Sequence, residues 1–297
     1  MATVEQVPDL IRGLSNTNPV VRTRCAKELG KLGPGAKDAF SHLVAAAEDR
    51  DQPVREAAVH ALGGFGTMAL STLVTFLLHS DKYVRRNAVW SLGKLGPQAK
   101  PALPSLCQAL RDEDPRTASG AAQALGSMGE KAADAVAALA EAMRGTNVVL
   151  CRLAAKALSQ VGRPAMATLI SHLKNHDPFV RGEAAVAIGW IGSAAEEAVP
   201  VLIDMLAPNV SARTPPHGSQ KTQHHHSGTV TPVVSTPIVT GETTTVDIAR
   251  SYAAQALGRI GPAANAAVPT LLHVVDDPCE QVRQMAETAL RQIQCDD

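Results

Sequence analysis

Hydrophobic residues follow a pattern that returns about every 33 residues along the chain. A leucine or isoleucine, here termed the anchor, occupies the same place in each copy: Leu29, Leu62, Leu92, Leu125, Leu158, Ile188, Leu257 and Leu290. The gaps between successive anchors are 33, 30, 33, 33, 30, 69 and 33 residues. Self-similarity at this period is typical of stacked supersecondary units rather than of one globular core.

Each copy predicts a pair of helices. Leucines four residues apart, such as Leu106 and Leu110, share one helical face and predict a short amphipathic first helix. Eleven residues before most anchors stands a residue that can cap a second helix: Asn18, Asp51, Asp81, Asp114, Asn147 or Asp177. The second helix is rich in alanine and is followed by a Gly-x-x-Gly step, as at Gly30 and Gly33. We expect both glycines to end this helix and turn the chain back.

An arginine usually stands seven residues before the anchor, at Arg22, Arg55, Arg85, Arg181, Arg250 and Arg283, whereas Ala118 and Cys151 interrupt this column. Together with Ala-Ala-x-Ala-Leu-Gly-x-Ile-Gly-Pro at residues 253–262, these columns resemble the HEAT repeat. The Gly-x-x-Gly-Pro ending is most similar to the subtype named after phycobilin lyases (PBS lyase HEAT-like repeat). The resemblance implies that the arginines pair with turn carboxylates, such as Asp51, Asp81 and Asp177, between repeats.

The sequence therefore predicts an all-α, right-handed α-solenoid of eight HEAT-like helix pairs with one long low-complexity insertion. We expect a single domain over residues 1–297, with repeats at about 4–33, 34–66, 67–96, 97–129, 130–162, 163–192, 193–261 and 262–295. Two gaps are only 30 residues long, and the missing residues fall between the second glycine and the first-helix leucine. The first helices of repeats 3 and 6 should therefore follow shorter turns.

The insertion lies within repeat 7, at residues 208–243, because the 69-residue gap exceeds the usual spacing by 36 residues. It is rich in threonine, proline and serine and contains His224, His225 and His226. It is either a flexible loop or a folded ribbon that contacts a partner or covers the concave surface. The three histidines are weak candidates for a metal site, since consecutive loop residues rarely enclose a metal ion, and otherwise we expect no metal and no cofactor.

Composition excludes several classes of function. The formal net charge is zero, which disfavours a nucleic-acid-binding protein, and no apolar run approaches the ~20 residues that span a membrane. Five cysteines are an odd number and form no Cys-x-x-Cys motif. Reduced, inert thiols in a reducing compartment explain them, and we expect a cytoplasmic protein.

Four positions of the second helix, at +1, +2, +5 and +9 from the arginine column, vary most between copies, and we name them the variable stripe. In a HEAT-like stack they should face solvent on the concave side. Their basic residues are Arg24, Lys27, Lys31, Arg86, Lys94, Arg152, Lys156 and Arg259, against only Glu56 and Glu183. Trp90, Trp190 and Tyr252 lie on the same stripe. Arginine and tryptophan carry much of the binding energy in protein interfaces.

The preferred hypothesis is a non-catalytic scaffold that binds a protein partner, acidic in character, on this locally basic concave face. The predicted partner-binding residues are Arg24, Lys27, Arg86, Trp90, Arg152, Lys156, Trp190 and Tyr252. The alternative for this surface is a merely solvated helix face. The alternative functions are a phycobilin-lyase-like chromophore lyase subunit and, less favoured, a HEAT-like nucleic-acid-binding module. Deoxyhypusine hydroxylase, a third use of this repeat type, is disfavoured because the chain has no His-Glu dipeptide.

Overall fold

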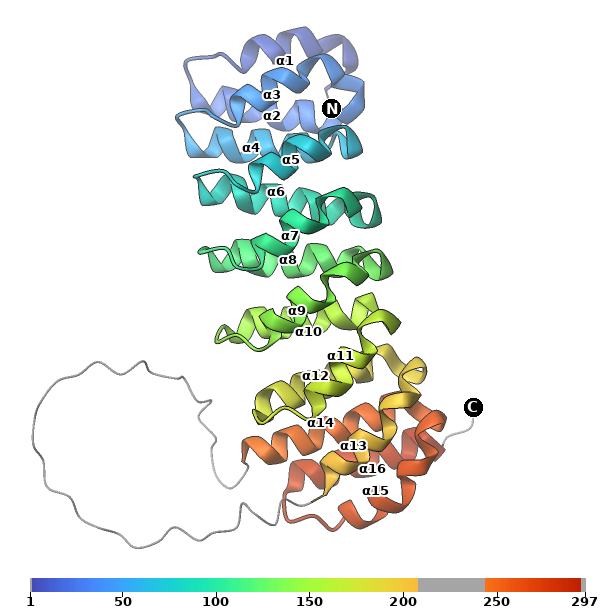
Figure 1. Ribbon diagram of the computed structural model, residues 1–297. Coiled ribbons are helices and arrows are strands. Elements are labelled where there is room, and N and C mark those ends of the chain that lie inside the picture. The colour runs from blue at the N-terminus through green and yellow to red at the C-terminus, as the bar shows by residue number, and fades with distance from the viewer. Residues whose placement is uncertain (1, 208–243, 295–297) are drawn as a thin grey trace, which may run out of the picture.

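The computed structural model describes residues 2–207 and 244–294, and in these residues every regular element is helical. Short first helices alternate with longer second helices along an elongated stack (Figure 1). The first helices are α1 (Val7–Gly13), α3 (Phe40–Ala46), α5 (Leu70–Phe76), α7 (Leu103–Ala109), α9 (Val136–Met143), α11 (Met166–Leu173), α13 (Val199–Leu206) and α15 (Val268–Val274). The second helices are α2 (Pro19–Leu32), α4 (Gln52–Gly63), α6 (Lys82–Leu95), α8 (Pro115–Ser127), α10 (Val148–Val161), α12 (Pro178–Ile191), α14 (Thr245–Ile260) and α16 (Glu280–Gln294). The predicted all-α solenoid is confirmed.

A short 3₁₀ segment joins each second helix to the next first helix. Five of these segments have seven residues: Gly33–Ala39, Gly96–Ala102, Gly129–Ala135, Gly192–Ala198 and Gly261–Ala267. The other two are shorter, with four residues at Gly66–Ala69 and three at Arg163–Ala165. These two lead into α5 and α11, the first helices of repeats 3 and 6, so the prediction of tighter entry turns there is confirmed. The regular 3₁₀ geometry itself was not predicted.

The second helices begin where the sequence places their caps. The side chains of Asn18, Asp81, Asp114, Asn147 and Asp177 each accept a hydrogen bond from a backbone N–H of the first helical turn. Asp51 occupies the same position without such a bond. Helix α14 is capped differently, because Thr244 and Asp247 bond reciprocally to each other's backbone N–H. These bonds satisfy donors that a helix start otherwise leaves without partners.

The two glycines of the Gly-x-x-Gly step have different roles, so the prediction that both end the helix is half wrong. The second glycine adopts a positive φ, as at Gly192 (φ 72°), and terminates the helix. The first lies inside the helix against the next second helix. A Cβ at Gly30 would stand 2.6 Å from Ala61 Cα, and one at Gly189 would stand 3.1 Å from Ala256 Cα. Glycine is present there because the two helices approach too closely for a side chain.

This close approach makes the layer of second helices the tighter of the two layers. Each second helix packs along its neighbours from α2 to α16, whereas contacts between successive first helices are sparser. The resemblance to HEAT repeats implies that this more closely packed layer of second helices lines the concave side.

Residues Pro178–Leu206 are together long and apolar enough to cross a membrane by length and composition. In the structure this segment is two helices, α12 and α13, separated by the turn at Gly192. Helix α12 has 14 residues and α13 has eight, and each is shorter than the ~20 residues that a bilayer requires. Both helices instead pack within the stack, where α12 contacts α10 and α14.

Helix α13 ends at Leu206 and α14 begins at Thr245, on either side of the segment where the sequence predicts the insertion. Residues 208–243, with His224, His225 and His226, lie outside the described residues. Within the described residues no cluster of three histidine, cysteine, aspartate or glutamate side chains could hold a metal ion.

Candidate functional site

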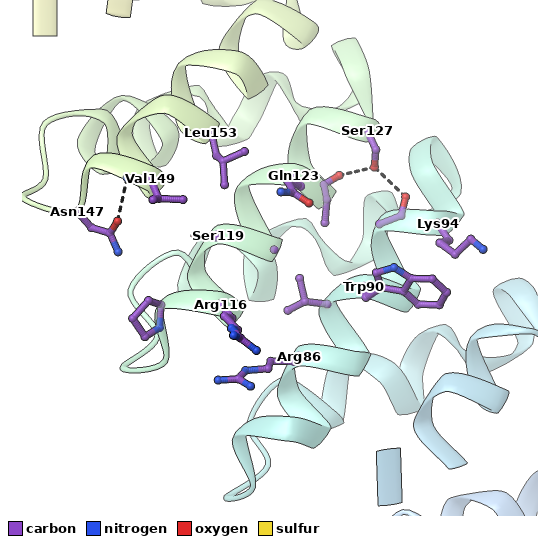
Figure 2. Close-up of a pocket in the computed structure, with 15 residues that line it drawn as sticks. Arg86, Trp90, Lys94, Arg116, Ser119, Gln123, Ser127, Asn147, Val149 and Leu153 are labelled. Carbon is purple, nitrogen blue, oxygen red and sulfur yellow. Dashed lines mark hydrogen bonds between the residues drawn. The ribbon is translucent and has the colours of Figure 1, made fainter. Parts of the chain in front are cut away.

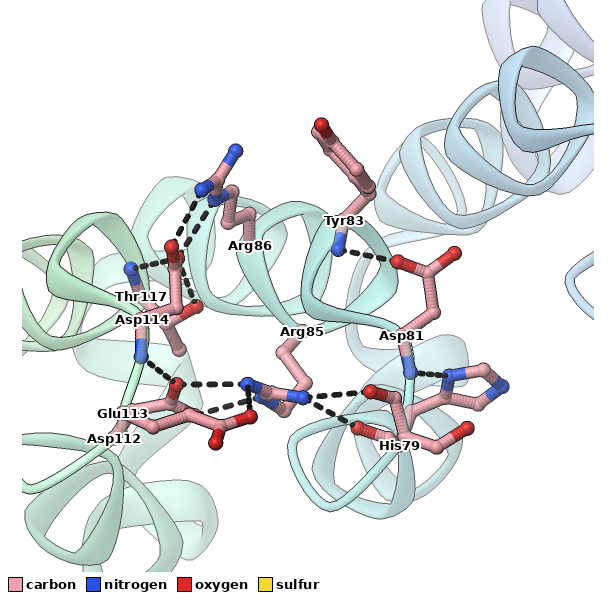
Figure 3. A network of polar contacts seen from close by, with 10 residues as sticks. His79, Asp81, Tyr83, Arg85, Arg86, Asp112, Glu113, Asp114 and Thr117 are labelled. Atoms are coloured by element: carbon pink, nitrogen blue, oxygen red, sulfur yellow. Dashed lines mark hydrogen bonds and ion pairs between the residues drawn. The ribbon is translucent and has the colours of Figure 1, made fainter.

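The arginine column forms a structural ladder between repeats. The Nε of Arg22 donates to Asp49 at 2.7 Å, that of Arg55 to Asp81 at 2.7 Å, and that of Arg85 to Asp112 at 2.8 Å. The Nη1 of each arginine donates to two carbonyls of the turn before its own helix, as Arg85 does to His79 and Ser80 (Figure 3). Each arginine thus fixes one turn and attaches it to the next repeat. These side chains are occupied by the fold and are not available to a ligand.

The ladder is interrupted in the middle of the chain. Cys151 replaces arginine in α10, and its buried Sγ donates to the Gly145 carbonyl at 3.1 Å. Asp177 therefore receives no arginine from repeat 5 and only caps α12, so its predicted pairing is wrong. Arg181 bonds the carbonyls of Asn175 and His176 and makes no ion pair with any residue that the structure describes. Burial raises the pKa of the Cys151 thiol, which is consistent with an inert side chain.

A groove of about 730 Å³ lies across α6, α8 and α10, in the middle of the variable stripe (Figure 2). Helix α6 contributes Arg86, Trp90 and Lys94 to one wall, and α10 contributes Val149 and Leu153 to the other. The floor is α8, with Ser119, Gly120, Gln123, Ala124 and Ser127. The groove is therefore open to solvent along three successive second helices.

The groove exists because α8 carries smaller side chains than its neighbours at the +1 and +5 positions. Ser119 and Gln123 of α8 stand at the +1 and +5 positions that Arg86 and Trp90 occupy in α6. At Gly120 a Cβ would stand 2.9 Å from Val89 Cγ1, so this glycine lets α8 pack closely on α6. At one end of the groove, the Ser127 hydroxyl donates to the Gly93 carbonyl at 2.9 Å and ties the two helices together.

The groove is positively charged. Arg86, Lys94 and Arg116 line it, and no acidic side chain of the described residues does. Arg86 is bound to buried Asp114 of the next repeat, with Nε 2.7 Å from Oδ2 (Figure 3). This guanidinium, opposed by burial, holds the pKa of Asp114 well below its usual value. Lys94 and Arg116 make no ion pair with any described residue, so their charges remain available in the groove.

Trp90 forms one corner of the groove. Its ring stacks on His60 of α4, with centroids 4.5 Å apart, and the Lys94 Nζ lies 4.6 Å from its centroid. Even so, 46% of Trp90 is exposed. Burial lowers the pKa of His60, and the nearby Lys94 and Lys27 lower it further, so the imidazole is neutral at pH 7. The +5 residues of repeats 1 to 3 thus form a continuous row.

The other predicted binding residues are spread over the second helices. Arg24, Lys27 and Lys156 are exposed and make no ion pair with a described residue, and Trp190 is 48% exposed on α12. Tyr252 is half-buried, and its ring lies against Gly182 of α12. Arg152 is exposed, but its Nε donates to buried Glu183 at 3.2 Å. Of the eight predicted residues, the structure brings Arg86 and Trp90 together in the groove.

Sequence reasoning missed Arg116 and Val149. Arg116 stands two positions before the arginine column, outside the variable stripe. Val149 follows the Asn147 cap and is 61% exposed, beside Val148 at 45%. The sequence signal for this was the pair of valines directly after the Asn147 cap. Adjacent large apolar side chains that a protein exposes at its surface often mark an interaction site.

Comparison with known protein families agrees with this architecture. The HEAT repeats profile matches residues 2–63, 40–107, 70–152 and 136–214, which together cover most of the chain. The chain belongs to the HEAT-repeat family. The PBS lyase HEAT-like repeat profile also matches this HEAT-repeat protein, at residues 249–277. Both assignments confirm the resemblance seen in the sequence.

Several solved structures are similar to this HEAT-repeat protein. They include an engineered protein (20% identity, 97% of this chain and 78% of that chain covered, TM-score 0.47) and human deoxyhypusine hydroxylase in complex with glycerol (21%, 98% and 96%, 0.37). Another is the complex of CpcE and CpcF of phycocyanin lyase from a Nostoc species (21%, 99% and 95%, 0.44). No curated protein sequence matches the chain.

Proposed function

We propose that this HEAT-repeat protein is a non-catalytic scaffold that binds a protein partner on the concave layer of second helices. The groove across α6, α8 and α10 is the observation that carries the proposal. It combines a half-exposed tryptophan, an exposed valine and cations that make no ion pair with a described residue on one continuous surface. A polar surface that surrounds aromatic and apolar side chains is typical of protein interfaces.

The charge distribution supports an acidic partner. Carboxylates neutralise Arg22, Arg55 and Arg85 of the ladder, whereas several cations of the variable stripe make no ion pair with a described residue. These unpaired residues are Arg24, Lys27, Lys94, Lys156 and Arg259. Complementary charge across an interface accelerates association and suppresses wrong partners. The whole chain has no net charge, so this attraction is confined to the concave layer.

A pull-down with mass spectrometry tests the proposal. Wild type is compared with a triple variant of the stripe, Arg24→Glu, Lys27→Glu and Lys156→Glu, and with a triple control, Lys37→Glu, Lys100→Glu and Lys131→Glu. The control changes the net charge equally but alters exposed lysines of the 3₁₀ segments. A partner captured by wild type and by the control, and lost from the stripe variant, supports the proposal. Equal capture by all three proteins and by Arg116→Glu, which changes the groove itself, contradicts it.

A phycobilin-lyase-like chromophore lyase subunit is the second candidate, favoured by the PBS lyase HEAT-like match at residues 249–277. Co-expression with a phycobiliprotein subunit and a bilin distinguishes the two functions, because only a lyase would increase bilin fluorescence on that subunit. A nucleic-acid-binding module would instead capture nucleic acid, with affinity that falls steeply as salt rises.

A further inference from the structure

The groove across α6, α8 and α10 brings exposed apolar side chains together with cations that make no ion pair with a described residue. Arg116 of α8 is exposed, and Val149 and Leu153 of α10 stand on the opposite wall from Trp90. Val149 is 61% exposed and Trp90 is 46% exposed. An exposed apolar surface next to a groove marks a site that a partner covers.

From this arrangement we infer that the groove binds a protein segment in which one or two large apolar side chains are flanked by aspartate or glutamate. The apolar side chains lie on α8, between Trp90 and the Val149–Leu153 wall. The carboxylates pair with Arg116 and Lys94. This inference rests on the proposed function and names the partner's chemistry and its place, which is repeats 3 to 5.

The floor of the groove explains why the groove accommodates a protruding side chain of the partner rather than a flat partner surface. Ser119 and Gly120 leave the space that larger residues occupy at the equivalent positions of α6 and α10. The Ala124 and Gly93 backbones are in close contact beneath it, since a Cβ at Gly93 would stand 3.4 Å from Ala124 Cα. The depth is thus fixed by helix packing, and no loop has to move to open the groove. A site that is already formed costs little to organise on binding.

The charges of the groove select an acidic segment. Arg86 is already held by Asp114, and its guanidinium also lies 4.9 Å from the Tyr83 ring centroid. Arg116 and Lys94 are left as the cations that a ligand can meet, and no described acidic side chain lines the groove. A basic segment would therefore be repelled, and a neutral apolar one would leave these cations without partners.

Selection of phage-displayed random 12-residue peptides on the full-length protein tests the inference. Enriched peptides are then synthesised and titrated against wild type, Arg116→Glu, Ser119→Glu and the control Lys131→Glu. The expected consensus is a leucine, isoleucine, phenylalanine or tryptophan next to aspartate or glutamate. Affinity should fall at least tenfold in Arg116→Glu and in Ser119→Glu, which add negative charge to the groove, and stay unchanged in Lys131→Glu.

Three outcomes would overturn the inference: no enriched consensus, a basic or uncharged consensus, or an acidic consensus that Arg116→Glu does not weaken. Binding of a mixed-sequence single-stranded DNA 12-mer that depends on Arg116, without peptide binding, would also overturn it. The proposed scaffold function can hold even if the groove is not its site. A partner that depends on Arg24, Lys27 and Lys156 but not on Arg116 or Ser119 leaves the scaffold function standing and removes only the groove as its site.

Discussion

At the scale of single residues, the cations available to a partner are those that form no ion pair within the fold. Arg86 and Arg152 are both arginines of the variable stripe, yet Asp114 and Glu183 of the following repeats bind them. Each partner is largely buried, at 7% and 5% exposure. Reversing Arg86 or Arg152 would therefore leave a buried carboxylate facing a like charge and destabilise the fold. Lys27, Lys156 and Arg116 are the better probes of binding.

Trp90 is the residue whose loss should affect partner binding most. We expect Trp90→Ala to weaken an authentic complex by about 2 kcal/mol or more, because large aromatic side chains at the centre of an interface carry much of its energy. Calorimetric titration of the purified partner measures the effect. Helical circular dichroism should be unchanged, since almost half of Trp90 is exposed and its ring contacts are with the side chains of His60 and Lys94. An unchanged affinity would place the interface elsewhere.

Glu183 should make stability depend on pH. Burial raises the pKa of Glu183 above its ordinary value of 4.5, and Arg152 offsets this only in part. The native state therefore holds the proton more tightly than the unfolded state. Stability should fall as the pH rises from about 4.5 through the raised pKa, because the carboxylate must then ionise while buried.

The variant Glu183→Gln removes this ionisation. Relative to wild type, we expect its melting temperature to be higher at pH 8 than at pH 4, measured by thermal melts at both values. The control Glu141→Gln changes a carboxylate that is 56% exposed and should show no such difference. If Glu183→Gln and wild type have parallel pH profiles, the Glu183 carboxylate is not destabilised by burial.

At the scale of helices, the sequence predicted the pairs of α-helices and most of their N-caps, but not the 3₁₀ segments between them. The helix pairs, the N-cap residues and the short turns before α5 and α11 all follow from local spacing. The groove does not follow from local spacing, because its depth is set by the side-chain sizes of three helices, α6, α8 and α10, that lie side by side in space. The ion pairs of Arg86 and Arg152 could not be predicted either, since their partners lie 28 and 31 residues further along the chain.

Glycine inside the second helices gives an element-scale prediction. In an ordinary helix, glycine to alanine stabilises by about 1 kcal/mol. We expect Gly30→Ala to lower the melting temperature instead, because its Cβ would meet Ala61 Cα at 2.6 Å and push α2 from α4. Ser159 occupies the equivalent position of α10, and Ser159→Ala should be tolerated. A rise in melting temperature for Gly30→Ala would refute the close packing.

The first helices are held by leucines buried between the layers. Leu106 of α7 is fully buried, whereas Leu272 of α15 is 55% exposed. We expect Leu106→Ala to reduce the free energy of unfolding by about 2–5 kcal/mol, since truncation leaves a cavity. The same change at Leu272 should cost much less, because little apolar contact is lost. Chemical denaturation of both variants measures the difference, and equal losses would contradict the assigned burial.

At the scale of the whole molecule, the stack separates stability from binding. The arginine ladder, the Gly–Ala contacts and the buried anchors hold neighbouring repeats together. The unpaired cations of the variable stripe, such as Lys27 and Lys156, lie outside these contacts, which leaves them free to differ from repeat to repeat. In such a solenoid the binding surface extends over several repeats, and its chemistry is set by the stripe.

The affinity of the captured partner for the two triple variants tests the central claim most directly. Titration calorimetry compares wild type with two triple variants. The first is the stripe variant, Arg24→Glu, Lys27→Glu and Lys156→Glu. The second is the control, Lys37→Glu, Lys100→Glu and Lys131→Glu. Binding on the concave layer predicts at least a tenfold loss of affinity in the first variant, larger at low salt, and wild-type affinity in the second. Equal affinity for all three proteins and for the groove variant Arg116→Glu would contradict a binding surface on the second helices.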